Sequence, residues 1–400
     1  MRIAELNMCV NGSTGKIMLQ IADKARAYGH EVRTYSTHQY HKKYKKLPIP
    51  PQGHKYYGTY VENGIHFVLA RQTGRNGCFG RFMTWRLIRE LKEYKPDILH
   101  LHNLHGFCIN LPLLFKYIRQ ENIRVIWTLH DCWSFTGHCP HFESIGCDKW
   151  KTGCYECSKY REYPKSIVDN SSKMYRLKKR WFTGLNNMTL VTPSKWLKNL
   201  VKESFMKEYP VKVIPNGIDL SVFQPANGEE KRDYLCEGKY MLLGVASSWG
   251  EAKGLDVFIE LSKRLSNEYQ IVLVGTNDEI ESVLPETIVS IQRTESQKEL
   301  ARLYSAADVF IDPTREDNYP TVNMEALACG TPVITFDTGG SPEIIDETCG
   351  VVVPKNDVDK LIEEIERVIC KKVFSTEQCL KKAKAFDMNQ TLKLYMELYQ

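Results

Sequence analysis

Residues 312–333 read Asp312-Pro-Thr-Arg-Glu-Asp-Asn-Tyr-Pro-Thr-Val-Asn-Met-Glu325-Ala-Leu-Ala-Cys-Gly330-Thr-Pro-Val333. The pattern predicts the end of a strand, a polar loop, a short helix that stops at Gly330, and a second strand. Amides in such a loop can hold a phosphate, and a carboxylate about one turn into the helix can bind both hydroxyls of a ribose. The stretch therefore predicts a parallel α/β sheet with a nucleotide site at its edge.

Strands and helices alternate on both sides of this stretch. Strands are expected at residues 2–10, 30–36, 97–102 and 124–130 in the first half, and at 189–191, 211–214, 240–246, 269–274, 309–312 and 332–336 in the second. This β-α-β order is typical of parallel sheets, and 400 residues suit two such domains. We expect a boundary at residues 193/194 and a final helix, 386–400, that packs back on the first domain.

The two halves of the chain carry opposite net charges. Residues 1–193 contain 30 Lys and Arg against 14 Asp and Glu, whereas residues 194–400 contain 24 against 34. A basic half indicates an anionic partner, such as nucleic acid, a lipid surface or a phosphorylated substrate, unless the charge only faces solvent. Nucleic acid is not expected as a partner, because no nucleic-acid-binding motif accompanies the charge.

The hydropathy pattern of the chain predicts its location in the cell. Residues 1–7 lack the apolar core of a secretory signal, and no stretch approaches about 18 uncharged apolar residues. We therefore expect a cytoplasmic protein without a membrane-spanning helix.

Three other polar turns follow predicted strands. Gly12-Ser-Thr-Gly-Lys opens a helix and suits a phosphate, although a plain tight turn is an equal alternative. Thr128-Leu-His130-Asp131 ends a strand, where a doubly wound sheet binds ligands and where a histidine can also be structural. Lys253 stands beside a glycine at a predicted helix N-terminus, which suits either a diphosphate or solvent.

Five of the 13 cysteines fall within residues 132–157, which form an insertion. The series Cys139, Cys147, Cys154 and Cys157 ends in a Cys-x2-Cys pair with the spacing of a zinc knuckle. Since cytosolic thiols stay reduced, the series predicts a structural zinc, with free thiols or a loop packed by its own aromatic residues as alternatives. Alternative ligands are Cys132, His138 and His141.

The chain resembles the retaining glycosyltransferases of family 4 over nearly its whole length. The motifs that carry the resemblance are the Gly12 turn, Gly29-His-Glu-Val, Pro96-Asp-Ile-Leu-His100, Thr128-Leu-His130-Asp131, Ile214-Pro-Asn-Gly-Ile-Asp219, Lys253-Gly254, Leu303-Tyr-Ser-Ala-Ala-Asp308, and the Glu325 helix with Ala-Cys-Gly-Thr-Pro-Val. The chain is particularly similar to members that build bacterial capsule, colanic acid or other exopolysaccharide. The resemblance implies the GT-B fold, in which two Rossmann-like parallel-sheet domains face each other across a cleft. Residues 1–193 would form the acceptor side and residues 194–385 the nucleotide-sugar domain.

The resemblance also implies roles for individual residues. Glu325 would hold the nucleotide ribose, and Lys253 would neutralise the diphosphate leaving group. Asp317 takes the first acidic position of the family's pair near the donor sugar, and His130 lies beside the transferred sugar. The remaining implied contacts are Gly12 against the diphosphate and the backbone amides of Tyr319, Thr321 and Val322.

Two positions depart from the family pattern. Asp317 stands where the family usually has Glu, with Glu316 adjacent. Ser247 and Ser248 stand where the family has an Arg before Lys253. Neutralisation of the diphosphate would then depend on Lys253 and amides, or on a basic residue from elsewhere.

The implied reaction moves a sugar from a UDP- or GDP-sugar to a saccharide or lipid-diphosphate-linked acceptor in bacterial surface polysaccharide synthesis. It retains the anomeric configuration, and it needs no metal or other cofactor at the diphosphate because lysine and helix N-termini can stabilise the departing charge. The alternatives are a non-hydrolysing sugar-nucleotide epimerase of the same fold and a binding subunit that has lost catalysis, which the two departures favour.

Two basic segments of the first half suit an anionic membrane surface, at the inner face of the plasma membrane. One is a loop that contains Tyr40, Lys42, Lys43, Tyr44, Lys45 and Lys46. The other is the predicted helix Arg81–Tyr94, where Phe82, Trp85 and Ile88 accompany Arg81, Arg86 and Arg89. The alternative for the helix is that its apolar side chains face the domain core.

Overall fold

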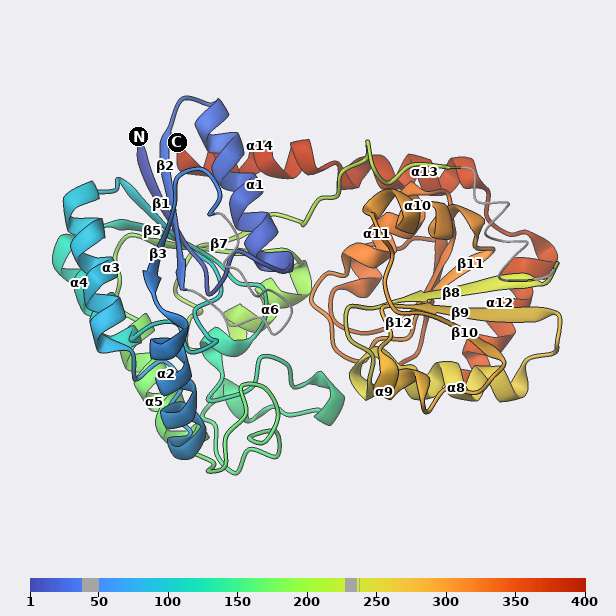
Figure 1. Ribbon diagram of the computed structural model, residues 1–400, viewed down its shortest axis with the longest axis horizontal. Coiled ribbons are helices and arrows are strands. Elements are labelled where there is room, and N and C mark those ends of the chain that lie inside the picture. The colour runs from blue at the N-terminus through green and yellow to red at the C-terminus, as the bar shows by residue number, and fades with distance from the viewer. Residues whose placement is uncertain (38–49, 227–235, 237) are drawn as a thin grey trace. The chain divides into compact units, whose positions relative to one another are not determined.

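The computed structural model describes residues 1–37, 50–226, 236 and 238–400. The chain divides into two compact units (Figure 1). The N-terminal unit comprises Met1–Phe142, Gly146–Ile214 and Leu392–Gln400, and the C-terminal unit comprises Glu143–Ile145 and Pro215–Thr391. Among the described residues, no helix is both long and apolar enough to cross a membrane.

The N-terminal unit contains a seven-stranded parallel sheet in the order β3-β2-β1-β4-β5-β6-β7. Its strands are β1 (Arg2–Leu6), β2 (Glu31–Thr37), β3 (His54–Gly58), β4 (Ile98–Leu101), β5 (Arg124–Thr128), β6 (Met188–Thr192) and β7 (Val211–Val213). The chain runs outward from β1 to β3 and then returns to β4, so the strand order reverses between β1 and β4. Ligands bind at the carboxyl ends of the strands at such a reversal.

Helices cover both faces of this sheet (Figure 1). They are α1 (Ser13–Ala27), α2 (Tyr60–Thr73), α3 (Arg81–Tyr94), α4 (Leu111–Glu121), α5 (Ser171–Phe182) and α6 (Lys195–Glu203), with single 3₁₀ turns at η1 (Trp133–Phe135) and η3 (Lys149–Lys151). The 3₁₀ turn between these two, η2 (Glu143–Ile145), belongs to the C-terminal unit. The core under α4 and α5 is aromatic: the ring centroid of Phe182 lies 4.6 Å from that of Phe115 and 5.0 Å from that of Trp127.

The N-terminal unit is longer than the sequence predicts. Residues 194–214 belong to it, because β7 pairs with β6 and extends the first sheet. The last helix, α14 (Met388–Tyr399), enters the same unit from Leu392 onward. There the Arg124 guanidinium donates to the carbonyls of Leu398 at 2.6 Å and Tyr399 at 2.8 Å.

The C-terminal unit contains a six-stranded parallel sheet in the order β10-β9-β8-β11-β12-β13. Its strands are β8 (Tyr240–Val245), β9 (Tyr269–Val274), β10 (Ile288–Ile291), β11 (Val309–Asp312), β12 (Val333–Phe336) and β13 (Gly350–Val353). The strand order reverses between β8 and β11. The two all-parallel sheets confirm the predicted doubly wound α/β fold.

In Figure 1, α10 and α11 lie on one side of the second sheet and α8 and α9 on the other. The helices of this unit are α8 (Leu255–Arg264), α9 (Asp278–Glu281), α10 (Gln297–Ala306), α11 (Thr321–Ala328), α12 (Val358–Lys371) and α13 (Thr376–Ala383), with 3₁₀ turns at η4 (Glu251–Lys253), η5 (Ser341–Glu343) and η6 (Lys384–Phe386).

Candidate functional site

Two loops meet where the second sheet reverses its strand order. One follows β8 and the other follows β11, its neighbour. The amide of Arg315 donates to the Ala252 carbonyl at 2.8 Å, and the Thr314 hydroxyl donates to the same oxygen at 3.2 Å. The Arg315 guanidinium binds both carboxylate oxygens of Asp256 at 2.7 Å and the Glu251 carbonyl at 2.6 Å. These bonds fix the η4 turn, which carries Lys253, against the loop after β11.

Gly254 allows this close approach of the two loops. Its φ of +70° lies in the left-handed region, and a Cβ there would come within 2.5 Å of the Pro313 carbonyl oxygen. Gly250, four residues earlier, has extended backbone, and a Cβ there would meet nothing within 4 Å. Only Gly254 is therefore required by the backbone and by its neighbour.

We expect Gly254→Ala to lower the free energy of unfolding by more than about 1 kcal/mol, because the new Cβ adds a clash to an unfavourable φ. Gly250→Ala is the matched control and should change the melting temperature little. Thermal unfolding of both variants checks this expectation, and equal melting temperatures would contradict it.

Lys253 and Asp317, which the sequence predicts as partners in one site, form an ion pair. The ammonium also lies 3.4 Å from the Thr314 hydroxyl. Burial acts to lower the pKa of Lys253, but the charges of Asp317 and Asp312 outweigh it and raise that pKa above its ordinary value. Lys253 is therefore a full positive charge at neutral pH, held at the carboxyl edge of the sheet.

Asp312, at the end of β11, was not among the predicted site residues. Burial raises its pKa to about 7, against the opposing charge of Lys253. Its Oδ2 atom is buried and has no hydrogen-bond partner within the part of the chain that the structure describes. Asp312 thus adds a second carboxyl group beside the Lys253 ammonium.

Helix α11 places the carboxylate of Glu325. The helix starts at Thr321, after Pro320, which supplies no side-chain cap to its first turn. Glu325 lies one turn further, half-buried, and its Oε2 accepts a hydrogen bond of 3.1 Å from the buried Tyr304 hydroxyl. The uncapped first turn, at Thr321 and Val322, and this fixed carboxylate are the two elements that the sequence assigned to phosphate and ribose. The preceding side chain, Tyr319, is buried.

The N-terminal unit brings its predicted residues to the carboxyl edge of the first sheet. Gly12 follows β1 and His130 follows β5, the strands on either side of β4. Gly12 has a φ of +83°, and a Cβ there would meet nothing within 4 Å. Glycine is therefore needed for the backbone, and the space beside it is open to a ligand.

His130 is hydrogen-bonded within a row of histidines. Its Nε2 lies 3.1 Å from Nδ1 of His102, and the two rings are stacked. Burial lowers the pKa of His130 to about 4, although Asp131 opposes the shift. The ring is therefore neutral at neutral pH and suits hydrogen bonding rather than an ionic contact.

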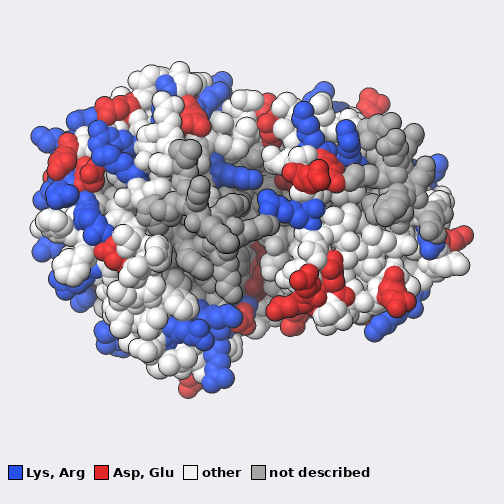
Figure 2. Space-filling model, in the orientation of Figure 1, with Lys and Arg blue, Asp and Glu red and all other residues white. Residues whose placement is uncertain are grey.

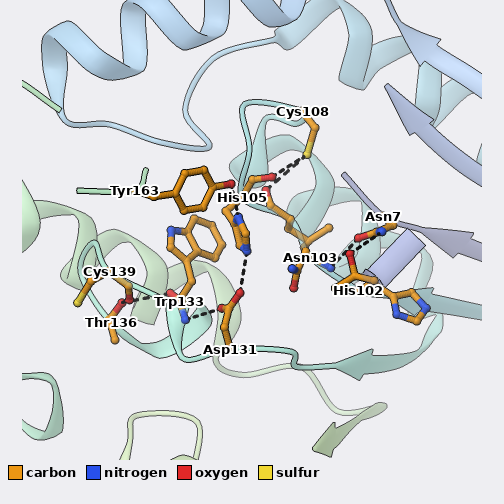
Figure 3. A network of polar contacts seen from close by, with 12 residues as sticks. Asn7, His102, Asn103, His105, Cys108, Asp131, Trp133, Thr136, Cys139 and Tyr163 are labelled. Atoms are coloured by element: carbon orange, nitrogen blue, oxygen red, sulfur yellow. Dashed lines mark hydrogen bonds and ion pairs between the residues drawn. The ribbon is translucent and has the colours of Figure 1, made fainter. Parts of the chain in front are cut away.

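A second polar network, drawn in Figure 3, lies beside this row. His105 Nε2 is 2.9 Å from a carboxylate oxygen of Asp131, whose other oxygen accepts from the Trp133 amide at 2.8 Å. Tyr163 Oη lies 2.8 Å from His105 Nδ1. Burial acts to raise the pKa of Asp131, but His105 outweighs it and holds that pKa at about 2. This pairing joins the loop after β4 to the loop after β5, and the sequence did not predict it.

The cysteine insertion brings some of its predicted ligands together. The Cys139 and Cys157 thiols act on each other, raising the pKa of Cys139 and lowering that of Cys157, and the Gly137 amide donates to Cys154 Sγ at 3.1 Å. Within the described ranges, one group of three or more His, Cys, Asp or Glu side chains has all its ligand atoms within 4.8 Å, and it contains none of these cysteines. The zinc site at Cys139, Cys147, Cys154 and Cys157 therefore stays a prediction.

Two apolar side chains of α3 face solvent. Phe82 is 82% exposed and Trp85 is 59% exposed, with the Arg89 guanidinium over the Trp85 ring at 5.4 Å. The alternative that they face the core is wrong for these two, whereas Ile88 is partly buried against the core. The other basic segment, with Tyr40, Lys42, Lys43, Tyr44, Lys45 and Lys46, lies outside the described residues.

Charge is distributed as the sequence indicates. On the face shown in Figure 2, Lys and Arg are spread over the N-terminal unit, and Asp and Glu form distinct groups on the C-terminal unit.

Two known protein families match the two halves of the chain. A family described as "Glycosyltransferase Family 4" matches residues 14–222, and one described as "Glycosyl transferases group 1" matches residues 239–371. Together the two matches contain all of the predicted site residues except Gly12.

The chain is also similar to individual proteins over most of its length. The chain is 26% identical, over 328 residues that make up 76% of each protein, to the putative colanic acid biosynthesis glycosyl transferase WcaC of Escherichia coli. Among solved structures, it is similar to sucrose-phosphate synthase of Thermosynechococcus elongatus, with a TM-score of 0.73, 17% identity and 100% and 98% of the two chains covered. It is also similar to Anabaena HepE in complex with UDP-glucose, with a TM-score of 0.68, 14% identity and 100% and 99% covered. These structural neighbours share the fold.

Proposed function

Because the chain belongs to glycosyltransferase family 4, we propose that it moves one sugar from a UDP- or GDP-sugar to the hydroxyl of a saccharide acceptor, with retention of the anomeric configuration. The observation that carries this proposal is the group at the carboxyl edge of the second sheet. There Lys253 and Asp317 form an ion pair, and Glu325 lies one turn into a helix whose start has no side-chain cap.

Each part of a nucleotide-sugar has a matching element in the proposal. Lys253 and the first amides of α11, at Thr321 and Val322, stabilise the charge that develops on the departing diphosphate. Glu325 accepts hydrogen bonds from the ribose hydroxyls. Asp317 contacts the donor sugar, and it binds Lys253 while no donor is present.

The N-terminal unit supplies the remaining contacts. Gly12 lies against the diphosphate, since no Cβ occupies the space beside its backbone. His130 hydrogen-bonds the transferred sugar as a neutral ring. The mechanism assigns no step to a metal, because the lysine and the helix amides provide the positive potential.

The acceptor is a saccharide that is extended during the synthesis of a bacterial surface polysaccharide. This assignment rests on WcaC, which is named for colanic acid biosynthesis. Uridine is the first donor base to test, because Anabaena HepE has been solved with UDP and with UDP-glucose. A lipid-diphosphate-linked saccharide is the acceptor class that suits the basic N-terminal half, which carries 30 Lys and Arg against 14 Asp and Glu.

Ligand screening followed by transfer assays tests the proposal. A nucleoside diphosphate at about 100 times its Kd should add about 2.7 kcal/mol of apparent stability. Donor consumption should then require a saccharide acceptor. Stabilisation by no nucleotide would overturn the proposal, whereas accumulation of an epimer without acceptor would identify an epimerase. Binding without any turnover would identify a binding subunit.

The enzyme also attaches to an anionic membrane surface through α3. Phe82 and Trp85 are exposed beside Arg81 and Arg89, and aromatic side chains with arginine are suited to a lipid interface. We expect Phe82→Ser/Trp85→Ser to weaken co-sedimentation with anionic vesicles about 25-fold, since partial burial of each aromatic side chain is worth about 1 kcal/mol and the two together about 2 kcal/mol. Tyr28→Ser, at a side chain of the same unit that is 51% exposed, is the control.

Binding to anionic vesicles should fall as salt rises and should be absent with neutral lipid. If the parent protein ignores anionic vesicles at low salt, the basic charge serves a soluble substrate instead.

The cysteine insertion holds a structural zinc. Burial raises the pKa of Cys154 to about 11, against the opposing effects of the Gly137 amide and Lys178, so the thiolate there depends on a bound metal. We expect about one zinc per chain in the parent and in Cys370→Ser, whose cysteine is exposed and distant in sequence. Cys157→Ser should lose the metal and melt at a lower temperature. Elemental analysis that finds no zinc in protein prepared without chelator would reject this assignment.

A further inference from the structure

A buried cluster of Glu5, His100 and His102 lies between β1 and β4. Glu5 is opposite His100 in the register of the two strands, and His102 follows β4. All three side chains are fully buried. Each offers one possible ligand atom, and the three atoms lie within 4.8 Å of one another, which no other group of three or more His, Cys, Asp or Glu in the described part of the chain achieves. The cluster therefore has the residue types and the spacing of a metal site.

Two atoms of this cluster face each other without a hydrogen bond. Glu5 Oε2 lies 3.6 Å from His102 Nε2. Neither atom has a hydrogen-bond partner among the residues that the structure describes. Buried polar atoms are nearly always paired, because leaving one without a partner is costly. Two such atoms side by side therefore indicate a ligand that binds both of them.

The separation of the two atoms distinguishes the possible ligands. It is too long for a direct hydrogen bond, which joins N and O at about 2.7–3.2 Å. It is too short for a bridging water, since two hydrogen bonds of about 2.8 Å that meet at a tetrahedral angle set their outer atoms about 4.5 Å apart. A transition-metal ion about 2.0–2.2 Å from each atom, as in zinc sites, sets them about 3.3–3.7 Å apart. The observed 3.6 Å fits a shared metal ion.

The outer ring nitrogens of both histidines are held as they are in metal sites. A ligating histidine usually hydrogen-bonds its second ring nitrogen to a neighbour, which fixes the orientation of the ring. His100 Nε2 lies 2.8 Å from Thr128 Oγ1, and His102 Nδ1 lies 3.1 Å from His130 Nε2. Nδ1 of His100 and Nε2 of His102 are then the ligand atoms.

The Tyr399 hydroxyl supplies a further oxygen. It lies 2.7 Å from His100 Nδ1 and 3.3 Å from Glu5 Oε1, and the Tyr399 side chain is fully buried at the end of α14. A bound ion would replace the hydrogen bond between Tyr399 and His100. A buried divalent cation needs two negative charges beside it, and the Glu5 carboxylate and a metal-bound Tyr399 phenolate provide them.

We propose that Glu5, His100, His102 and Tyr399 bind one divalent transition-metal ion, which ties β1 and β4 to the C-terminal helix α14. Two imidazoles with oxygen ligands suit iron(II) and zinc. Four protein ligands and full burial are typical of a structural site rather than a catalytic one. The inference is independent of the proposed function, because no step of sugar transfer is assigned to this ion.

Elemental analysis in the Cys157→Ser background is the first test, because that variant removes the zinc expected in the cysteine insertion. Protein purified without chelator should contain about one transition-metal ion per chain. Glu5→Gln or His102→Gln, added to this background, should lose the ion. His54→Gln is the matched control and should keep it, because His54 is also a buried histidine of this sheet, with its ring nitrogens 2.9 Å from Thr34 Oγ1 and 3.1 Å from Ser36 Oγ.

Cobalt substitution identifies the ligands. Cys157→Ser is unfolded with chelator and refolded with cobalt chloride. Nitrogen and oxygen ligands give weak visible bands, whereas soft thiolates add strong charge-transfer absorption in the near ultraviolet. We expect the weak visible bands alone, and we expect Glu5→Gln to abolish them.

Melting temperatures provide a third readout. Zinc chloride at about 100 times its Kd should raise the melting temperature of metal-free Cys157→Ser by about 5 °C. Glu5→Gln and His102→Gln in the same background should not respond to zinc chloride.

Three results would overturn the proposal. They are Cys157→Ser without any transition metal, a metal content that His102→Gln leaves unchanged, and thiolate charge-transfer bands in cobalt-loaded Cys157→Ser. The first and the third need no substitution in the cluster, so they decide the matter even if Glu5→Gln and His102→Gln do not fold. None of these results depends on a transfer assay, so the proposed function stands or fails separately.

Discussion

Lys253→Met is expected to lower kcat by a factor of about 100 or more while leaving the fold intact. Removing one preorganised group that stabilises developing charge typically costs about 100- to 1,000-fold in rate. Lys253 should fall in this range because Ser247 and Ser248 replace the second cation expected in the family, and Asp256 engages the guanidinium of Arg315. Lys253 would then carry most of the neutralisation of the leaving group.

Removing Lys253 alone also leaves Asp317 without its ion-pair partner. The double variant Lys253→Met/Asp317→Asn removes both charges and so tests whether repulsion by a bare carboxylate causes the loss. If Lys253 stabilises the leaving group, the double variant should stay at least about 100-fold slower than Asp317→Asn alone. Lys263→Met, at an exposed position on α8, is the control for loss of a lysine from the same unit.

Steady-state kinetics with a saturating acceptor, together with melting temperatures, decide the outcome. Turnover of Lys253→Met within about threefold of the parent, which is less than about 1 kcal/mol in activation free energy, would show that the diphosphate is neutralised elsewhere.

The fold was predictable because its signals are local. Alternation of short apolar strands with helical stretches, and glycines at the turns, specify parallel sheets over spans of about 30 residues. The domain boundary was placed too early because β7, the strand that extends the first sheet beyond residue 193, is only three residues long. Its pairing with β6 spans a helix and a loop, and no local pattern encodes which sheet a short edge strand joins.

The candidate site was predictable where the residues lie close to a turn. Lys253, Asp317 and Glu325 each follow a strand or open a helix, so the sheet topology alone gathers them. The supporting contacts depend on tertiary packing. Asp256 binds Arg315 across 59 residues, and His102 meets His130 only because β4 and β5 are adjacent.

The sequence also could not decide between exposure and burial for α3. Its apolar residues recur at helical spacing, which predicts a face but not what covers that face. Leu87 and Leu91 on the same helix are fully buried, whereas Phe82 and Trp85 extend from the side that no other element covers among the described residues.

Glu325→Gln is expected to weaken binding of the nucleoside diphosphate about ten- to a hundredfold. A hydrogen bond to a charged group is worth about 1.5–3 kcal/mol, and the substitution removes the charge and one of two acceptor oxygens while keeping the shape. The Tyr304 hydroxyl, which donates to Glu325 Oε2 at 3.1 Å, orients the carboxylate. Tyr304→Phe should therefore weaken binding less than Glu325→Gln does.

A nucleotide that lacks the ribose hydroxyls makes the test specific. The parent should bind 2′,3′-dideoxy-UDP about as weakly as Glu325→Gln binds UDP, and the variant should lose little further affinity for the dideoxy compound. Glu363→Gln, at an exposed position on α12, should bind both nucleotides as the parent does. Calorimetric Kd values for the four combinations of parent or Glu325→Gln with either nucleotide decide the matter. Equal losses for both nucleotides would mean that Glu325 supports the loop rather than the ribose, and an unchanged Kd for UDP would remove Glu325 from the site.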